Sequence, residues 1–80
     1  MDYTAVVDLR SYHPRERLAW IDMTLSHLGR DEDMIIILEH EPEHLAARLA
    51  ERHTASLIVE EIEAGPEVWR YRIAYHRAPD

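Results

Sequence analysis

The stretch Met34-Ile35-Ile36-Ile37-Leu38 decides the fold that this chain can adopt. A continuous apolar run with three isoleucines in succession is typical of a strand that is covered on much of both faces. The segments before and after such a strand must supply the layers that cover it. We therefore predict a buried strand over residues 34–38, and the rest of the fold follows from the patterns around it.

Helical patterns lie on both sides of this strand. Pro14 suits the first turn of a helix, and apolar residues then recur at helical spacing until Gly29. These residues are Leu18, Ile21, Leu25 and Leu28. Pro42 suits a second helix start, and an apolar stripe follows it. The stripe consists of Leu45, Ala46, Leu49 and Ala50. The sequence thus predicts one helix that begins at Pro14 and another that begins at Pro42.

Three further segments have the composition of strands. Residues 3–9 form a short apolar and β-branched run. Residues 57–63 and 68–76 both have an extended pattern, and the turn residues Gly65-Pro66 stand between them. The last two segments therefore predict a hairpin at the C-terminal end of the sequence.

The side chains of this hairpin suggest its register. We expect Glu63 to lie opposite Val68, so that Glu61 faces Arg70 on one side of the hairpin. Apolar residues then meet on the other side, namely Ile58, Ile62, Trp69 and Ile73. The period-two spacing also places four residues on one face and predicts that they pack in the core. They are Trp69, Tyr71, Ile73 and Tyr75.

The order of elements is βαβαββ, with no linker and no internal repeat. Right-handed crossovers would place both helices on one face of a four-stranded mixed sheet. We therefore expect a single α/β domain over residues 1–80, arranged as an α+β two-layer sandwich. Apolar residues occupy both alternating positions of the first two strands, as Val6 with Val7 and Ile35 with Ile36 show. An apolar patch on the open sheet face predicts a homodimer or a partner contact there.

Composition excludes several classes of protein. The 80 residues carry a formal net charge of -7, which repels phosphate backbones and anionic membrane surfaces, so we expect no nucleic-acid or membrane partner. Cysteine is absent, which rules out disulfides, thiolate nucleophiles, persulfide carriers and cysteine-type zinc sites. Residues 1–4 have no basic region and no long apolar stretch follows them, so we expect a cytoplasmic protein.

Residues 8–14, Asp-Leu-Arg-Ser-Tyr-His-Pro, resemble one junction of the TusA/SirA-like sulfur-carrier fold. In that family the first strand leads to a Cys-Pro pair at the mouth of the first helix, and the cysteine carries a persulfide. Pro14 is in place here, but His13 stands at the position of the cysteine, and an imidazole cannot hold a transferable persulfide. The resemblance implies a TusA/SirA-like fold without persulfide transfer.

A second resemblance covers nearly the whole chain. The positions that carry it are Asp8-Leu9-Arg10, Pro14, Glu16-Arg17, Gly29, His40, Pro42, Leu45 and Glu63-Ala64-Gly65-Pro66-Glu67-Val68-Trp69. They are similar to an uncharacterised bacterial family of domains of unknown function, related to the TusA fold and sometimes found with hemerythrin-like domains. The chain departs from that family at Glu39 and Glu41, where aspartates are usual, and at His44, where proline is commoner. The family has no settled activity, so the resemblance implies a fold and not a function.

The candidate site lies where the turns after the first two strands open at one edge of the sheet. Ligands usually bind at this edge in α/β folds. If the third strand runs parallel to the first two, the Gly65-Pro66 turn and the residues after it reach the same edge. We predict a ligand-binding or partner-binding site made of Arg10, His13, Pro14, Arg17, His40 and Trp69.

The arginines of this site suggest anion binding. The free N–H groups at the start of the first helix, together with Arg10 and Arg17, could hold a carboxylate, sulfate or phosphate-like group. The alternative is that Arg10 pairs with Asp8 or Glu41 and that Arg17 pairs with a neighbouring acid. In that case the arginines would only stabilise the fold.

The histidines suggest a metal site. His40 and His44 flank a helix start and, with His13 or a glutamate as a further ligand, could bind zinc, copper or iron. The alternative is that His40 orders the turn through hydrogen bonds and that His44 is solvated. The spacing does not distinguish the two.

Catalytic motifs are missing from the sequence. It contains neither a G-x-S-x-G motif nor a Walker pattern, so we expect a protein that is not an enzyme and that needs no cofactor. We therefore predict a small non-enzymatic binding or adaptor module that acts on a partner protein or a small ligand. The alternative is a histidine-based module that binds or delivers zinc, copper or iron in redox metabolism.

Overall fold

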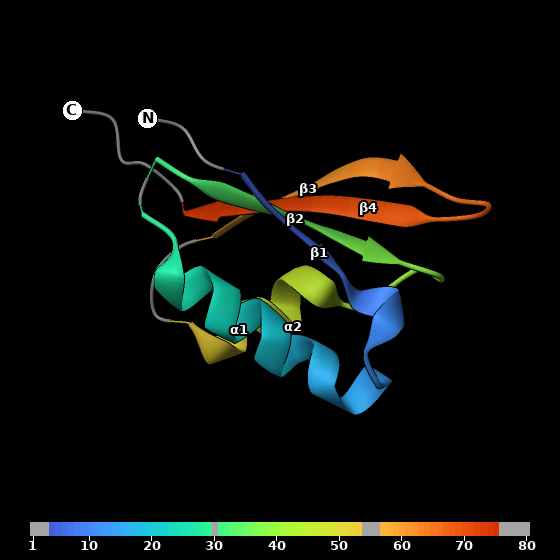
Figure 1. Ribbon diagram of the computed structural model, residues 1–80, viewed down its shortest axis with the longest axis horizontal. Coiled ribbons are helices and arrows are strands. Elements are labelled where there is room, and N and C mark those ends of the chain that lie inside the picture. The colour runs from blue at the N-terminus through green and yellow to red at the C-terminus, as the bar shows by residue number, and fades with distance from the viewer. Residues whose placement is uncertain (1–3, 30, 54–56, 76–80) are drawn as a thin grey trace.

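The computed structural model describes residues 4–29, 31–53 and 57–75, and its elements follow the order βαβαββ (Figure 1). The strands are β1 (Thr4–Asp8), β2 (Asp33–Leu38), β3 (Leu57–Ala64) and β4 (Trp69–Tyr75). The helices are α1 (Arg17–His27) and α2 (Leu45–Arg52). Two short 3-10 turns, η1 (Leu9–Ser11) and η2 (Pro14–Glu16), connect β1 to α1.

The four strands form one mixed sheet in the order β1-β2-β4-β3. β1 and β2 are parallel, and β4 is antiparallel to both of its neighbours, β2 and β3. β2 therefore lies inside the sheet, as its apolar sequence predicts. β3 runs in the same direction as β1 and β2, so the β3–β4 turn lies at the edge of the sheet where β1 and β2 end.

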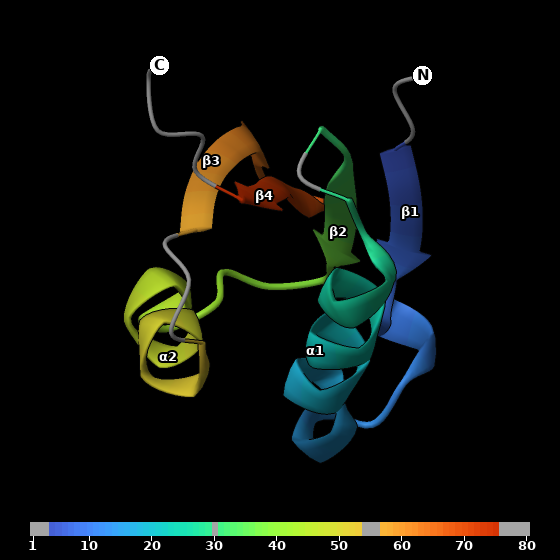
Figure 2. The ribbon, with the colours of Figure 1, turned by 90° about the vertical axis from the view of Figure 1, so that its left-hand side faces the viewer.

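Both helices lie on the same face of the sheet, as Figure 2 shows from the side. Alternate residues of β2, namely Met34, Ile36 and Leu38, are buried because they point toward this helical layer. The helices contribute Ile21, Leu25 and Leu49 to the same core. The predicted two-layer α/β sandwich with a four-stranded mixed sheet is confirmed.

Pro14 stands in the first helical turn, as predicted, although that turn is 3-10 helix, whereas the predicted start of the second helix at Pro42 is wrong by about one turn. Pro14 opens the separate turn η2, and α1 begins only at Arg17. α2 begins at Leu45 and not at Pro42, because His44 has φ 53° and ψ 38°. This left-handed conformation interrupts a right-handed helix.

The apolar stripe predicted on α2 is only partly buried. Leu49 is buried and Leu45 packs against the core, but Ala46 and Ala50 are exposed.

The predicted hairpin register is also wrong. Ala64 pairs with Trp69 and Glu63 with Arg70, because the turn lies one residue further along the chain than predicted. A bulge between Glu61 and Glu63 then shifts the register again, so that Glu61 pairs with Tyr71. The extra residue of the bulge, Ile62, is 48% exposed instead of meeting an apolar partner. The predicted core face of β4 is confirmed, since Tyr71 and Ile73 are buried and both Trp69 and Tyr75 pack against the core.

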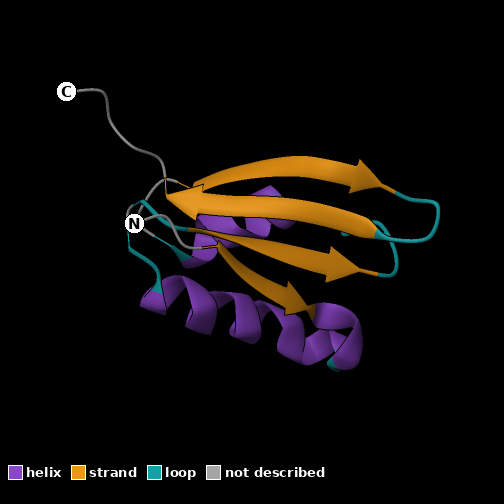
Figure 3. Ribbon diagram, turned by 45° about the horizontal axis from the view of Figure 1, so that its top comes forward, coloured by secondary structure: helices purple, strands orange, loops and turns teal. Residues whose placement is uncertain are grey.

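In Figure 3 the strands of the sheet lie in front of and above the helices. The sheet face opposite the helices carries both apolar and charged residues. Val6 is 62% exposed on β1, while Ile35 and Ile37 lie opposite Arg72 and Arg70 of β4. The mixture of isoleucine and arginine on this face makes it less apolar than the strand sequences of β1 and β2 suggest. Across the described ranges, neither helix has the length and hydropathy needed to cross a membrane.

Candidate functional site

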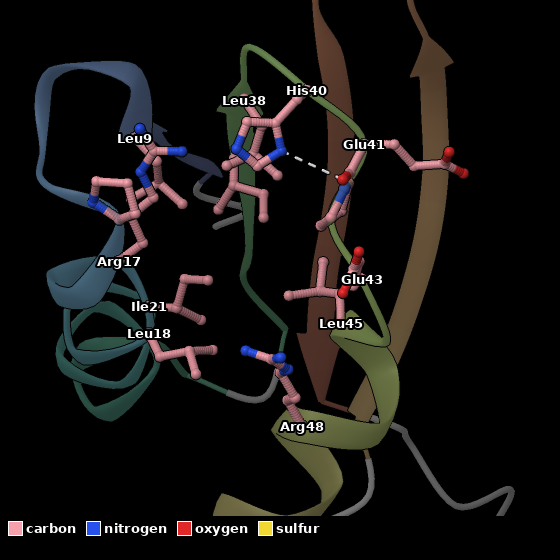
Figure 4. Close-up of a pocket in the computed structure, with 13 residues that line it drawn as sticks. Leu9, Arg17, Leu18, Ile21, Leu38, His40, Glu41, Glu43, Leu45 and Arg48 are labelled. Carbon is pink, nitrogen blue, oxygen red and sulfur yellow. Dashed lines mark hydrogen bonds between the residues drawn. The ribbon is translucent and has the colours of Figure 1, made fainter.

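A cavity of about 300 Å³ opens between the two helices at the edge of the sheet where β2 ends (Figure 4). Its walls come from η1, η2 and α1 on one side and from the β2–α2 loop and α2 on the other. Its apolar surface is made of Leu9, Pro14, Leu18, Ile21, Ile36, Leu38, Pro42 and Leu45. Its polar residues are Arg17, His40, Glu41, Glu43 and Arg48.

Arg17 is buried, and two of its three guanidinium nitrogens have partners within the protein. Its Nη1 lies 2.7 Å from Oε1 of Glu39, and its Nε donates to the carbonyl oxygen of Tyr12 at 3.1 Å. The hydrogen bond from Arg17 lowers the pKa of Glu39 below its ordinary value. Arg17 thus ties the start of α1 to the residue that follows β2, and it forms a fixed wall of the cavity.

Arg48 is the opposite case. It is exposed, and its side chain makes no ion pair or hydrogen bond within the described part of the chain. Figure 4 shows Arg48 reaching from α2 across the cavity toward Leu18 of α1. The N–H groups of the Arg48 guanidinium therefore face solvent at the mouth of the cavity.

His40 lies at the end of β2 on the rim of the cavity. Its Nδ1 is 3.2 Å from the carbonyl oxygen of Glu41, which can only accept, so this hydrogen bond places a proton on Nδ1. Its Nε2 is 3.5 Å from Oε1 of Glu39. His40 therefore contacts the β2–α2 loop through a hydrogen bond, as the predicted alternative to a metal ligand has it, while its side chain stays 62% exposed.

The other predicted site residues do not line the cavity. Arg10 forms a two-point ion pair with Asp8, in which Nε and Nη2 lie 2.8 and 2.7 Å from the two carboxylate oxygens. This contact lowers the pKa of Asp8. Trp69 packs against Gly65, whose φ is 63° and whose missing Cβ would lie 2.6 Å from the indole. Pro14, Arg17 and His40 are the predicted residues that the cavity brings together.

The three candidate metal ligands do not converge. His13 caps η2, and its Nδ1 accepts hydrogen bonds from the backbone N–H and Nε of Arg15 at 3.2 and 3.3 Å. His44 is exposed and makes no side-chain capping bond to α2. Within residues 4–29, 31–53 and 57–75, no three histidine or carboxylate side chains are grouped so that they could hold a metal ion.

A network of three side chains joins the middle of α1 to the C-terminal end of α2. Nε of Arg52 donates to Oδ2 of Asp22 at 2.6 Å, and Nε2 of His53 lies 2.8 Å from Oδ1 of the same carboxylate. Partial burial raises the pKa of Asp22, but the hydrogen bonds from Arg52 and His53 outweigh it, so the pKa lies below its ordinary value. We call these three residues the helix clasp, because they join α1 to the C-terminal end of α2.

Sequence reasoning missed Arg48 and most of the apolar surface. Arg48 lies three residues after Leu45, so helical spacing places both side chains on one face of α2. A pattern search for apolar positions identifies Leu45 but gives no reason to examine the arginine beside it. That spacing is the signal that could have found Arg48.

These observations define a small two-layer α/β domain with an apolar cavity and a charged rim at one edge of its sheet. The chain belongs to a family described as an uncharacterized conserved protein (DUF2249), whose model matches residues 6–75. The family resemblance proposed from the sequence is confirmed to that extent. Searches of curated proteins and of solved structures gave no match.

Proposed function

We propose that this protein is a non-enzymatic module that binds a small ligand in the cavity between α1 and the β2–α2 loop. The observation that carries the proposal is the composition of the walls, in which eight apolar residues surround a mouth with a few charged groups. Ligand sites in proteins combine an apolar lining with a small number of polar groups in the same way. The cavity volume of about 300 Å³ corresponds to the small end of the usual range.

A relation to the TusA/SirA-like fold is part of this proposal. The order βαβαββ and the position of Pro14 at the start of the helical region support it. His13 occupies the place of the sulfur-carrying cysteine and uses its Nδ1 to hold Arg15, so its role is structural. A binding function without persulfide transfer fits this substitution. The family resemblance alone suggests an association with hemerythrin-like partners.

The first test is NMR titration of the isotope-labelled chain with three six-carbon probes, hexanoate, hexanamide and hexylamine. We expect at least one probe to cause saturable shifts of cavity residues such as Leu18, Ile21 and Leu45. Leu18→Trp fills the cavity and should abolish these shifts. Met23→Trp, on an exposed part of the same helix, is the matched control and should retain them.

If no probe shifts the cavity residues, or if Leu18→Trp binds as well as the unaltered chain, the proposal fails. A parallel titration with zinc tests the metal alternative. Saturable one-site shifts at His40 and His44 would support a metal-binding module instead.

A further inference from the structure

Arg48 has no carboxylate partner among the described residues, although acids outnumber arginines in this chain. The sequence contains 16 acidic residues and nine arginines, so each arginine has many possible carboxylate partners. Arg10, Arg52 and Arg72 each pair with an aspartate in the structure. Arg48 makes no such pair among the described residues, although it lines a cavity. A guanidinium at the mouth of an apolar cavity is suited to pair with the carboxylate of a ligand.

The neighbouring polar groups do not compete for this role. Arg17 is occupied by Glu39 and by the carbonyl oxygen of Tyr12. The Glu41 side chain points away from the cavity (Figure 4), and the charge of Glu41 contributes to the raised pKa of Tyr71 on β4, after burial and the hydrogen bond to Glu61. Arg48 is therefore the cationic group that remains available to a ligand in this cavity.

We infer that the ligand is a small monocarboxylate with an aliphatic body. Its carboxylate pairs with Arg48, and its apolar part lies against Leu18, Ile21 and Leu45, which face one another across the cavity (Figure 4). The inference rests on the proposed function, since it names the chemical class that the same cavity binds. It adds a residue, Arg48, that the sequence did not indicate.

The charged residues on the rim of the cavity favour a ligand with one negative charge over a ligand with several. Arg48 supplies one positive charge, while Glu43 stands on the same rim and the whole chain carries a net charge of -7. A phosphate or a dicarboxylate would meet repulsion that the single arginine cannot offset. A monocarboxylate needs only one cationic partner.

The experiment compares the affinities of the same three probes, which have equal chain length and differ in their head group. We expect hexanoate to bind about tenfold more tightly than hexanamide, because only hexanoate forms a charge-assisted pair with Arg48. Hexylamine should bind more weakly than both. Added salt should reduce the advantage of hexanoate and leave hexanamide unchanged.

The variant Arg48→Gln should reduce the affinity for hexanoate to that for hexanamide and leave hexanamide binding intact, which also shows that the cavity has kept its shape. Arg70→Gln is the matched control, since Arg70 pairs with Glu63 on the opposite sheet face, and it should preserve the preference. Equal affinity of the unaltered chain for hexanoate and hexanamide, or a preference for hexylamine, would overturn the inference but support the proposed cavity. The absence of binding by all three probes would overturn both.

Discussion

The two helices form opposite walls of the cavity, but they are attached to the sheet in different ways. α1 buries Arg17, Ile21 and Leu25, and the carbonyl oxygen of Leu25 accepts a hydrogen bond from Tyr75 of β4 at 2.8 Å. α2 is shorter and buries only Leu49. The hydrogen bonds that Arg52 makes in the helix clasp join α2 to α1 and not to the sheet. The cavity therefore has one wall with three buried residues and another wall held by fewer buried side chains, namely Leu49 with Leu45 packed beside it.

The largest expected effect comes from removing the core side chain of Leu49. Leu49→Ala should lower the free energy of unfolding by about 2–5 kcal/mol, since it leaves a cavity in the core. Ile21→Ala should have a similar global effect, but Leu25 still anchors α1. We therefore expect faster amide exchange confined to α2 in Leu49→Ala only, measured by hydrogen exchange together with denaturant unfolding. Equal protection of the two helices in both variants would show that they are equally anchored.

A smaller effect should follow from removing the ion pair at the fixed wall. Arg17→Met keeps an apolar stem but loses the contacts to Glu39 and Tyr12, so we expect a loss of about 1–3 kcal/mol in unfolding free energy. The matched variant Arg10→Met removes an exposed pair with Asp8 and should cost clearly less than Arg17→Met, because solvent screens that pair. Denaturant unfolding measures both. A larger loss for Arg10→Met would reverse the assignment of Arg17 as the anchoring residue.

The helix clasp should contribute less to the unfolding free energy than the Arg17 contacts, because its ion pair is partly exposed, and its contribution should depend on pH. The folded pKa of Asp22 is lowered from 3.8, so the stabilisation is present above about pH 4 and is lost as the pH falls through the folded pKa. Asp22→Asn should therefore be less stable than the unaltered chain at pH 6, and the difference should shrink below pH 4. A difference that stays constant across this range would exclude the carboxylate as its source.

The smallest effect on stability is expected on the open sheet face, which neither helix covers. Val6→Lys changes an exposed side chain and should alter the unfolding free energy by at most about 0.5 kcal/mol. If this face pairs two copies of the chain, as the strand sequences predict, the mass in solution should rise with concentration, and Val6→Lys should prevent the rise. Sedimentation at several concentrations measures this. A monomer at all concentrations would remove the homodimer prediction.

The layers and element order were predictable because they depend on local periodicity. The apolar run at residues 34–38 and the spacing of Ile21 and Leu25 carry this information directly. The hairpin register was missed for two reasons: the turn closes at Gly65, where the Trp69 indole packs against the glycine, and a bulge follows at Ile62. The start of α2 was missed because no local sequence pattern predicts the left-handed backbone conformation of His44.

The candidate site was predictable in position but only partly in composition. Topology places the ends of β1 and β2 at one edge, which led to Pro14, Arg17 and His40. Whether an arginine is available depends on which acid lies beside it in space. Asp8 occupies Arg10 and Glu39 occupies Arg17, whereas Arg48 has no such neighbour among the described residues. The pair of Asp8 with Arg10 is easier to predict from the sequence than the pair of Glu39 with Arg17, because Asp8 and Arg10 are only two positions apart.

The contacts of Asp33 also bear on the order in which the chain folds. Its carboxylate accepts from the Thr4 hydroxyl, 29 positions away, and from Arg72, 39 positions away, so it joins three strands at one point. Long loops close slowly, whereas the β3–β4 hairpin needs only the short turn at Gly65. We therefore expect the hairpin to form before it docks on β2, and the Asp33 contacts to form after the rate-limiting step. Asp33→Asn should then speed unfolding and leave the folding rate nearly unchanged in stopped-flow measurements.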